Sequence, residues 1–159
     1  MNYGATEMIS DNNLLVPKEA ELKSLIWKYY DSCWHKGDFS IVDEFAGHFE
    51  SCDNNLWKIN GKQGIKDSMA RLRSGLFNLR GEIEEWFFQV DYQDDDFGFC
   101  DRVTIWWRIE GKFTGEIEGI SPTGKFVTVR GSSLLWLKDK KLVAARACSN
   151  IYQQLGSLP

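Results

Sequence analysis

After Leu79 the chain changes from helix-type to strand-type sequence, and this change constrains the fold more than any other feature. The strand-type segments are rich in Val, Ile, Phe, Trp and Thr, and they span 81–93, 99–118, 125–138 and 141–150. Turn-forming residues separate them at 94–98, 121–124 and 138–140. The first turn contains three adjacent Asp residues, which we interpret as a solvated hairpin tip rather than a cation site.

The residues before Leu79 show helical spacing instead. Pro17 suits the first turn of a helix, and apolar residues recur at helical spacing from there to Cys33. Gly37 is placed to end this helix. Two further helices are predicted, at 39–46 and 63–76. We expect residues 1–16 to form a flexible N-terminal arm and residues 17–159 to form a single domain.

Helices followed by a meander of strands predict an α+β fold. In such a fold, a strongly curved antiparallel sheet that wraps around the N-terminal helices leaves a blind cavity lined from both sides. A chain of 159 residues can bury a core of this kind without a metal or a disulfide. The chain also has seven Trp residues, and because indole is seldom fully buried, they suggest an aromatic pocket wall.

Composition argues against several functions. Lys and Arg number 19 against 23 Asp and Glu, a net charge of −4, which disfavours a nucleic-acid-binding face and attachment to anionic membranes. The four Cys form no C-x-x-C pair and the two His stand at no ligand spacing from them, so we expect no metal site. No apolar stretch approaches the roughly 20 residues of a membrane span. Since the N-terminus also lacks a secretory pattern, we expect a cytoplasmic protein with reduced thiols.

Several short motifs resemble the SnoaL-like polyketide cyclase family. They are Y-Y-D-S-C-W-H-K-G-D-F-S-I-V-D-E-F at 29–45, G-K-Q-G-I at 61–65, D-R-V at 101–103, P-T-G-K at 122–125 and Q-L-G at 154–156, with Pro159 after it. The resemblance implies the cone-shaped, cystatin-like α+β barrel shared with nuclear transport factor two, ketosteroid isomerase and scytalone dehydratase. It also implies a homodimer and cofactor-free chemistry, often an aldol ring closure.

The family's usual acid/base is an Asp on the final strand, and here that position reads differently. Counted from the start of the strand it is Asn150; counted back from Gln-Leu-Gly it is Ala147. An Asn side chain can donate to an oxyanion but cannot accept a proton at neutral pH. Strand alternation would put Arg146 on the same face as Asn150 and Leu142, where it could clamp a carboxylate or enolate. The alternatives are a strand-end cap for Asn150 and an exposed Arg146.

Other positions of the family pattern also differ. The Gly-Thr-His of the long strand appears as Gly111-Lys112-Phe113, which turns a possible base into an apolar wall. The His after the second helix corresponds to Cys52, which we take for a small buried thiol. Asp53 follows it and is the best remaining carboxylate near a pocket mouth, although a solvated loop Asp is the alternative.

The remaining aromatic residues predict a pocket for an apolar small molecule. The residues expected to contact it are Tyr29, Trp34, Cys52, Trp57, Trp86, Trp107 and Phe113. Because neighbours on a strand face opposite sides, one of Trp106 and Trp107 should meet the cavity and the other the helix side or a dimer partner.

Three functions fit these observations. The first is a cofactor-independent cyclase or isomerase that tailors a polyketide, terpenoid or alkaloid intermediate, with Asn150 and Arg146 as polar anchors and Asp53 or a strand Glu as the acid. The second is a non-catalytic binding protein for an apolar small molecule. The third is a dimerisation module with a vestigial pocket. We favour the first, because Asn and Arg near the pocket floor suggest altered rather than abandoned chemistry.

Overall fold

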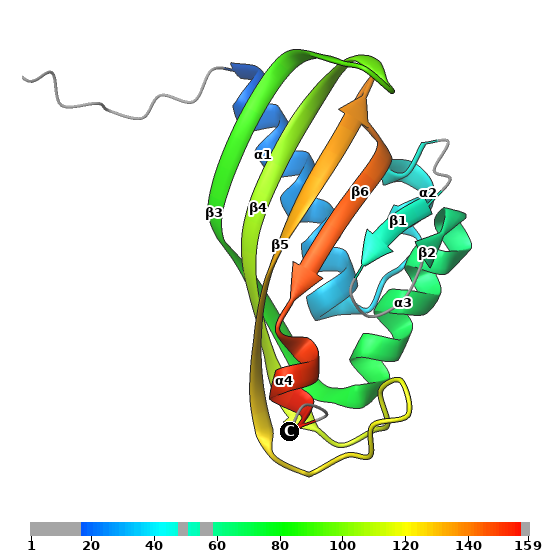
Figure 1. Ribbon diagram of the computed structural model, residues 1–159, viewed down its shortest axis with the longest axis vertical. Coiled ribbons are helices and arrows are strands. Elements are labelled where there is room, and N and C mark those ends of the chain that lie inside the picture. Colours follow the sequence, from blue (N-terminus) through cyan, green and yellow to red (C-terminus); the bar gives the residue numbers. More distant parts are fainter. Residues whose placement is uncertain (1–16, 48–50, 55–58, 157–159) are drawn as a thin grey trace, which may run out of the picture.

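The strand-type segments form one curved sheet in the order β2-β1-β6-β5-β4-β3 (Figure 1). Its long strands are antiparallel neighbours: β3 (Leu76–Asp94), β4 (Gly98–Phe113), β5 (Phe126–Lys138) and β6 (Lys141–Ser149). Beside β6, β1 (Ser51–Asn54) runs parallel to it, and β2 (Ile59–Asn60) runs antiparallel to β1. This computed structural model describes residues 17–47, 51–54 and 59–156. The predicted arm at 1–16 and Trp57 lie outside the described residues.

The predicted helices form at the expected places: α1 (Pro17–Asp31), which the π-helical turn η1 (Ser32–Lys36) continues, α2 (Ile41–Phe45) and α3 (Gly61–Gly75). A further short helix, α4 (Ile151–Leu155), forms where none was predicted. Gly37 ends η1 in the left-handed conformation, with φ of 68°, as predicted. None of the helices in the described part of the chain is long and apolar enough to cross a membrane.

One face of the sheet packs against α1, and we call it the inner face (Figure 1). α1 contributes Leu22, Ile26, Tyr29 and Tyr30 to the core. The sheet contributes alternate residues, among them Val103, Ile105, Ile109, Val129, Leu135 and Leu137. This α+β arrangement, a curved antiparallel sheet wrapped around N-terminal helices, confirms the predicted fold class.

Bulges bend the sheet and set which residues face inward. The pairing of β3 with β4 shifts register at three places, and two of them contain residues with positive φ, Asn78 at 56° and Asp91 at 52°. Extra residues of this kind increase the local bend and twist of a strand. The long strands therefore curl around α1 instead of lying flat.

The predicted strand at 99–118 is too long at its C-terminal end. β4 ends at Phe113, whose N–H donates to the carbonyl of Lys125 at 2.8 Å. The next two residues leave the ladder, because the N–H groups of Thr114 and Gly115 both donate to the carbonyl of Gly75 at the end of α3. The residues that follow form the connection to β5.

The predicted alternation along β6 is also wrong. Leu142 pairs with Leu137, and Ala144 pairs with Trp136, so Val143 is an extra residue in β6. A side-chain period of two cannot continue through such a bulge. Leu142 therefore faces the core, 3% exposed, while Arg146 belongs to the outer face of the sheet.

Candidate functional site

A chain of aromatic rings runs through the interior of the cone. Phe45 of α2 stacks on Tyr29 at a centroid distance of 4.5 Å, and Tyr29 meets Tyr30 edge-on at 4.9 Å. Tyr30 lies 4.5 Å from Trp34 of η1, and Trp34 lies 6.2 Å from Trp107 of β4. Of the predicted pocket residues, the structure thus brings Tyr29, Trp34 and Trp107 into one continuous chain of ring contacts. Aromatic pairs at these centroid distances stabilise a fold by more than the burial of their surface alone.

Two glycines make room for the indoles of this chain. A Cβ built on Gly81 of β3 would come within 2.3 Å of the Trp34 ring. A Cβ on Gly131 of β5 would come within 2.4 Å of the Trp107 ring and within 2.5 Å of the carbonyl oxygen of Cys148. Each indole therefore lies directly on strand backbone, so the interior surface depends on two positions that lack a side chain.

The end of η1 is also tied to the free edge of the sheet. His35 Nε2 accepts a hydrogen bond from the N–H of Gly81 at 3.1 Å, and its Nδ1 lies 2.8 Å from Asp31 Oδ1. The Nδ1 proton therefore points to the carboxylate, and the imidazole covers an edge N–H that would otherwise stay open to pairing. The geometry assigns His35 a structural role.

The indole N–H of Trp107 donates to the hydroxyl oxygen of Ser133 at 3.0 Å. Ser133 is 6% exposed and lies on the inner face, between Gly131 and the buried Leu135 on β5. On β6, the inner-face positions opposite these residues are occupied by Ala145, Ala147 and Ser149. All three are only partly buried, so this part of the inner wall is lined by small, accessible residues.

Ionisable groups are confined to one end of the described inner wall. There Asp91 and Asp101 both pair with Lys18 at the start of α1, at 2.6 and 2.8 Å. The other inner-face residues of β3–β6 are apolar or carry a hydroxyl. Nor do the described residues contain a cluster of His, Cys, Asp or Glu that could hold a metal ion. The described wall can hold an apolar ligand and donate hydrogen bonds to it, and the carboxylates it carries are paired with Lys18.

The buried thiol of Cys33 does not supply a nucleophile. Cys33 is 0% exposed, and burial, with a smaller effect of Asp38, raises its pKa to about 12. A thiol with such a pKa is almost wholly protonated at neutral pH.

Two of the predicted site residues lie on β1. In the parallel pairing with β6, Cys52 lies opposite Ala145 and Asp53 lies opposite Arg146. The predicted loop that carries them is thus a short strand of the sheet, added at the edge of β6.

Asn150 holds the end of β6 against β5. Its Oδ1 accepts the N–H of Arg130 at 2.9 Å, and its own N–H donates to the carbonyl of Arg130 at 3.1 Å. The side chain thus extends the strand ladder by one hydrogen bond just before α4 begins. This geometry corresponds to the strand-end cap, the structural alternative considered for this residue.

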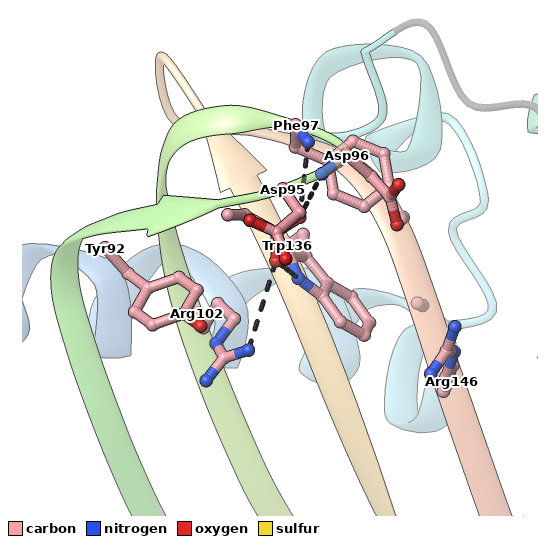
Figure 2. Close-up of a pocket in the computed structure, with 10 residues that line it drawn as sticks. Tyr92, Asp95, Asp96, Phe97, Arg102, Trp136 and Arg146 are labelled. Carbon is pink, nitrogen blue, oxygen red and sulfur yellow. Dashed lines mark hydrogen bonds and ion pairs between the residues drawn. The ribbon is translucent and has the colours of Figure 1, made fainter.

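Arg146 lines a pocket of about 360 Å³ on the outer face of the sheet (Figure 2). The tip of the β3–β4 hairpin folds over this pocket, and the Phe97 ring lies 5.9 Å from the Trp136 ring. The guanidinium of Arg146 lies 5.6 Å from the centre of the same indole, and that of Arg102 lies 3.7 Å above Tyr92. Arg146 therefore sits on the side of the sheet away from the core, as an accessible cation next to an aromatic ring.

Asp94 fixes the hairpin tip in this position. Its Oδ1 accepts the N–H groups of Asp96 at 2.9 Å and Phe97 at 3.2 Å, and its Oδ2 accepts the indole N–H of Trp136 at 2.9 Å. The N–H of Asp96, then the indole of Trp136, lowers the pKa of this carboxyl. The Asp run thus forms a hairpin tip, as predicted. Its first residue, Asp94, is not solvated but holds the tip against Trp136.

The other predicted pocket residues lie in different surroundings. Phe113 is 0% exposed and belongs to the core. Trp86 stacks on Phe88 at 5.9 Å along the edge strand β3, with the Nζ of Lys23 5.5 Å from its ring. Sequence reasoning missed Ser133. Its period-two spacing from Gly131 and Leu135 was the available signal for an inner position, but nothing in the sequence pointed to the bond with Trp107.

Comparison with known proteins gives the family. The sequence model of the SnoaL-like polyketide cyclases matches residues 24–157, and no curated protein matches the chain. A candidate SnoaL-like polyketide cyclase from Jannaschia sp. CCS1 superposes with a TM-score of 0.73 at 18% identity, over 91% of this chain and 98% of that one. TsrD from Streptomyces laurentii superposes with a TM-score of 0.71 at 17% identity, over 87% of this chain and 97% of its own.

AclR from Streptomyces galilaeus gives a TM-score of 0.69 at 20% identity, over 88% of this chain and 98% of its own. At these identities the likeness of structure shows a shared fold alone. The family assignment rests on the sequence match, which spans most of the chain. The chain belongs to the SnoaL-like polyketide cyclase family.

Proposed function

We propose that the chain is a cofactor-independent cyclase or isomerase that acts on a polyketide, terpenoid or alkaloid intermediate inside the cone. The observation that carries this proposal is the aromatic chain that ends with Trp107 on Ser133, beside the accessible small residues of β6. Such a wall suits a flat, mostly apolar molecule that bears an oxygen. Membership of a polyketide cyclase family supports the same class of substrate.

Cofactor-free closure or isomerisation needs a base that takes a proton next to a carbonyl, and a donor that holds the developing oxyanion. The described inner wall offers hydroxyl donors. Asp53 is not proposed as this base, because its pairing with Arg146 gives it a register position of the outer face. Arg146 lines the outer pocket, and Asn150 holds the end of β6 against β5, so neither is proposed to act inside the cone.

The proposal is tested by proton exchange at a ketone. 2-Tetralone, a bicyclic ketone, is incubated with the protein in D2O, and loss of the proton signals next to its carbonyl is followed by NMR. We expect exchange faster than in buffer alone, and Ala147→Phe, which fills the accessible stretch of the inner wall, to return the rate to that of buffer. Ala144→Phe, at an outer-face position of the same strand, is the matched control and should keep the wild-type rate. Exchange at the buffer rate with the wild-type protein would contradict the enzymatic proposal.

A second candidate is a non-catalytic binding protein for an apolar small molecule. The specific observation in its favour is that the described inner wall has carboxylates only where Asp91 and Asp101 pair with Lys18. The same experiment separates the two functions. A binding protein would take up 2-tetralone saturably, seen as a change in Trp fluorescence, without accelerating exchange.

We also propose that a second copy of the chain covers the outer face of the sheet. Phe87 of β3 and Trp106 of β4 lie on this face and are 63% and 48% exposed. Large apolar residues grouped on one sheet face are typical of protein interfaces. Sedimentation velocity should show a homodimer, and Trp106→Glu should shift it toward the monomer. A wild-type monomer at all concentrations would exclude this interface.

A further inference from the structure

We propose that the Ser133 hydroxyl is the hydrogen-bond donor that holds a carbonyl or enolate oxygen of the ligand, with Trp107 as the residue that positions it. The inference rests on the proposed use of the inner wall as a ligand site. It adds two things that do not follow from the family match: the residue that recognises the ligand, and the chemical group of the ligand that this residue binds.

The hydroxyl of Ser133 has an unused proton. Its oxygen accepts the indole N–H of Trp107 at 3.0 Å, and the residue is buried, with 6% of its surface exposed. A serine hydroxyl has one proton to donate besides its lone pairs. Among the described residues, no acceptor for that proton is present. Since buried donors are almost always satisfied, this proton is available to an acceptor on a bound ligand.

The surroundings of Ser133 leave space for such an acceptor. Ala147 is its direct neighbour on β6, and Gly131, two residues earlier on β5, is opposite Ser149. Ala147 and Ser149 are partly exposed although they lie on the inner face. The Trp107 ring covers Gly131 and would form one side of the site. A flat molecule placed against this indole would bring its edge toward Ser133.

The direction of the hydrogen bonds identifies the ligand group. Trp107 can only donate through its N–H, so the indole fixes the Ser133 oxygen as acceptor and leaves the hydroxyl as donor. A chain of donors that ends at the hydroxyl becomes stronger when it meets a negatively polarised oxygen. The site therefore selects ketones, enolates and phenolates. It disfavours ammonium groups, which have only N–H donors and cannot accept the hydroxyl proton.

A matched pair of ligands tests the recognition of oxygen. 9-Fluorenone and fluorene are flat tricyclic molecules of the same outline, and only fluorenone carries a carbonyl. In fluorescence titrations we expect the wild-type protein to bind fluorenone about tenfold more tightly than fluorene, since one buried hydrogen bond is involved. Ser133→Ala should bring the two affinities together. Ser132→Ala, the neighbour on the outer face, should keep the wild-type preference.

Ser133→Ala also leaves the N–H of Trp107 without its acceptor, so a loss of folding stability must be separated from a loss of recognition. The double variant Ser133→Ala/Trp107→Phe removes both partners, so no buried N–H is left unpaired, although the smaller ring loses some packing. It should still unfold cooperatively in urea and lack the preference for fluorenone. The infrared carbonyl band of bound fluorenone adds a direct signature: it should lie at lower frequency in the wild type than in Ser133→Ala.

The outcomes distinguish this inference from the proposed function. A preference for fluorenone that survives in Ser133→Ala, or equal wild-type affinities for both molecules, overturns the inference and leaves the apolar site intact. Binding of neither molecule overturns both. A preference that Ser133→Ala abolishes, combined with no exchange of 2-tetralone protons, supports Ser133 as the donor while removing the enzymatic proposal.

Discussion

The indole of Trp34 lies directly on the backbone of Gly81, so closely that a Cβ on the glycine would come within 2.3 Å of a ring carbon. The next residue of η1, His35, accepts the N–H of the same glycine. These two contacts hold the end of the first helix against the edge strand, and they set Trp34 6.2 Å from Trp107. The shape of the interior thus depends on an absent side chain.

Gly81→Ala is therefore expected to destabilise the fold. The new methyl group forces Trp34 or the edge of β3 to move, and overpacking of this kind typically costs about 1–3 kcal/mol. Urea denaturation followed by circular dichroism measures the free energy of unfolding. Gly64→Ala in α3 is the matched control, because its nearest neighbour would be a side-chain atom of Ile59 at 3.4 Å and Ala favours helix. Equal stability of Gly81→Ala and Gly64→Ala would show that the Trp34 contact is not restrictive.

Asp94 makes the stability depend on pH. Because the N–H of Asp96 and the indole of Trp136 lower its pKa from an ordinary value of 3.8, its contribution is complete above that value and is lost as the pH falls through the lower folded pKa. Asp94→Asn keeps an acceptor oxygen but does not titrate. As the pH falls below about 4, we expect the wild type to lose stability more steeply than Asp94→Asn.

Urea midpoints measured for both proteins across this range give the comparison. Other carboxyl groups titrate equally in both, so only the difference between the two curves reports on Asp94. Parallel curves would show that the hydrogen bonds to its carboxylate do not favour the charged form.

The sequence predicts the fold well where local signals agree. Glycine at position 37 ends the first helix as expected, with φ of 68°. The Asp run forms the β3–β4 turn, and the period-two rule separates Trp107, which meets Trp34 inside, from Trp106, which is 48% exposed outside. Each of these features depends on the conformation of a few consecutive residues, which residue type largely determines.

The site is harder to predict because it depends on register between strands. One extra residue, Val143, reverses the faces of β6 and takes Arg146 to the outer side, and no local signal marks that bulge. The bond between Trp107 and Ser133 is equally non-local. The two residues are diagonal neighbours on the adjacent strands β4 and β5. Such contacts depend on pairing that only the folded sheet defines.

The described free cysteines should differ sharply in reactivity. Cys148 is exposed on the outer face, whereas Cys33 is buried with a pKa raised to about 12. Since the thiolate is the reactive form, iodoacetamide at about pH 8 should alkylate Cys148 and spare Cys33 in the folded protein. Mass spectrometry of proteolytic peptides measures both sites, and protein unfolded in urea should be labelled at both. Similar labelling of the two thiols in the folded protein would contradict the packing around Cys33.

Asn150 should act on stability through the end of the β6 ladder. Its Oδ1 accepts the N–H of Arg130 at 2.9 Å, so Asn150→Ala removes that acceptor and should cost about 1 kcal/mol of unfolding free energy. Asn150→Asp keeps an acceptor in the same place and should stay within about 0.5 kcal/mol of the wild type. Urea denaturation of the three proteins measures the difference. If Asn150→Ala is as stable as the wild type, the strand-end bond does not stabilise the fold, and a role for Asn150 in the pocket regains support.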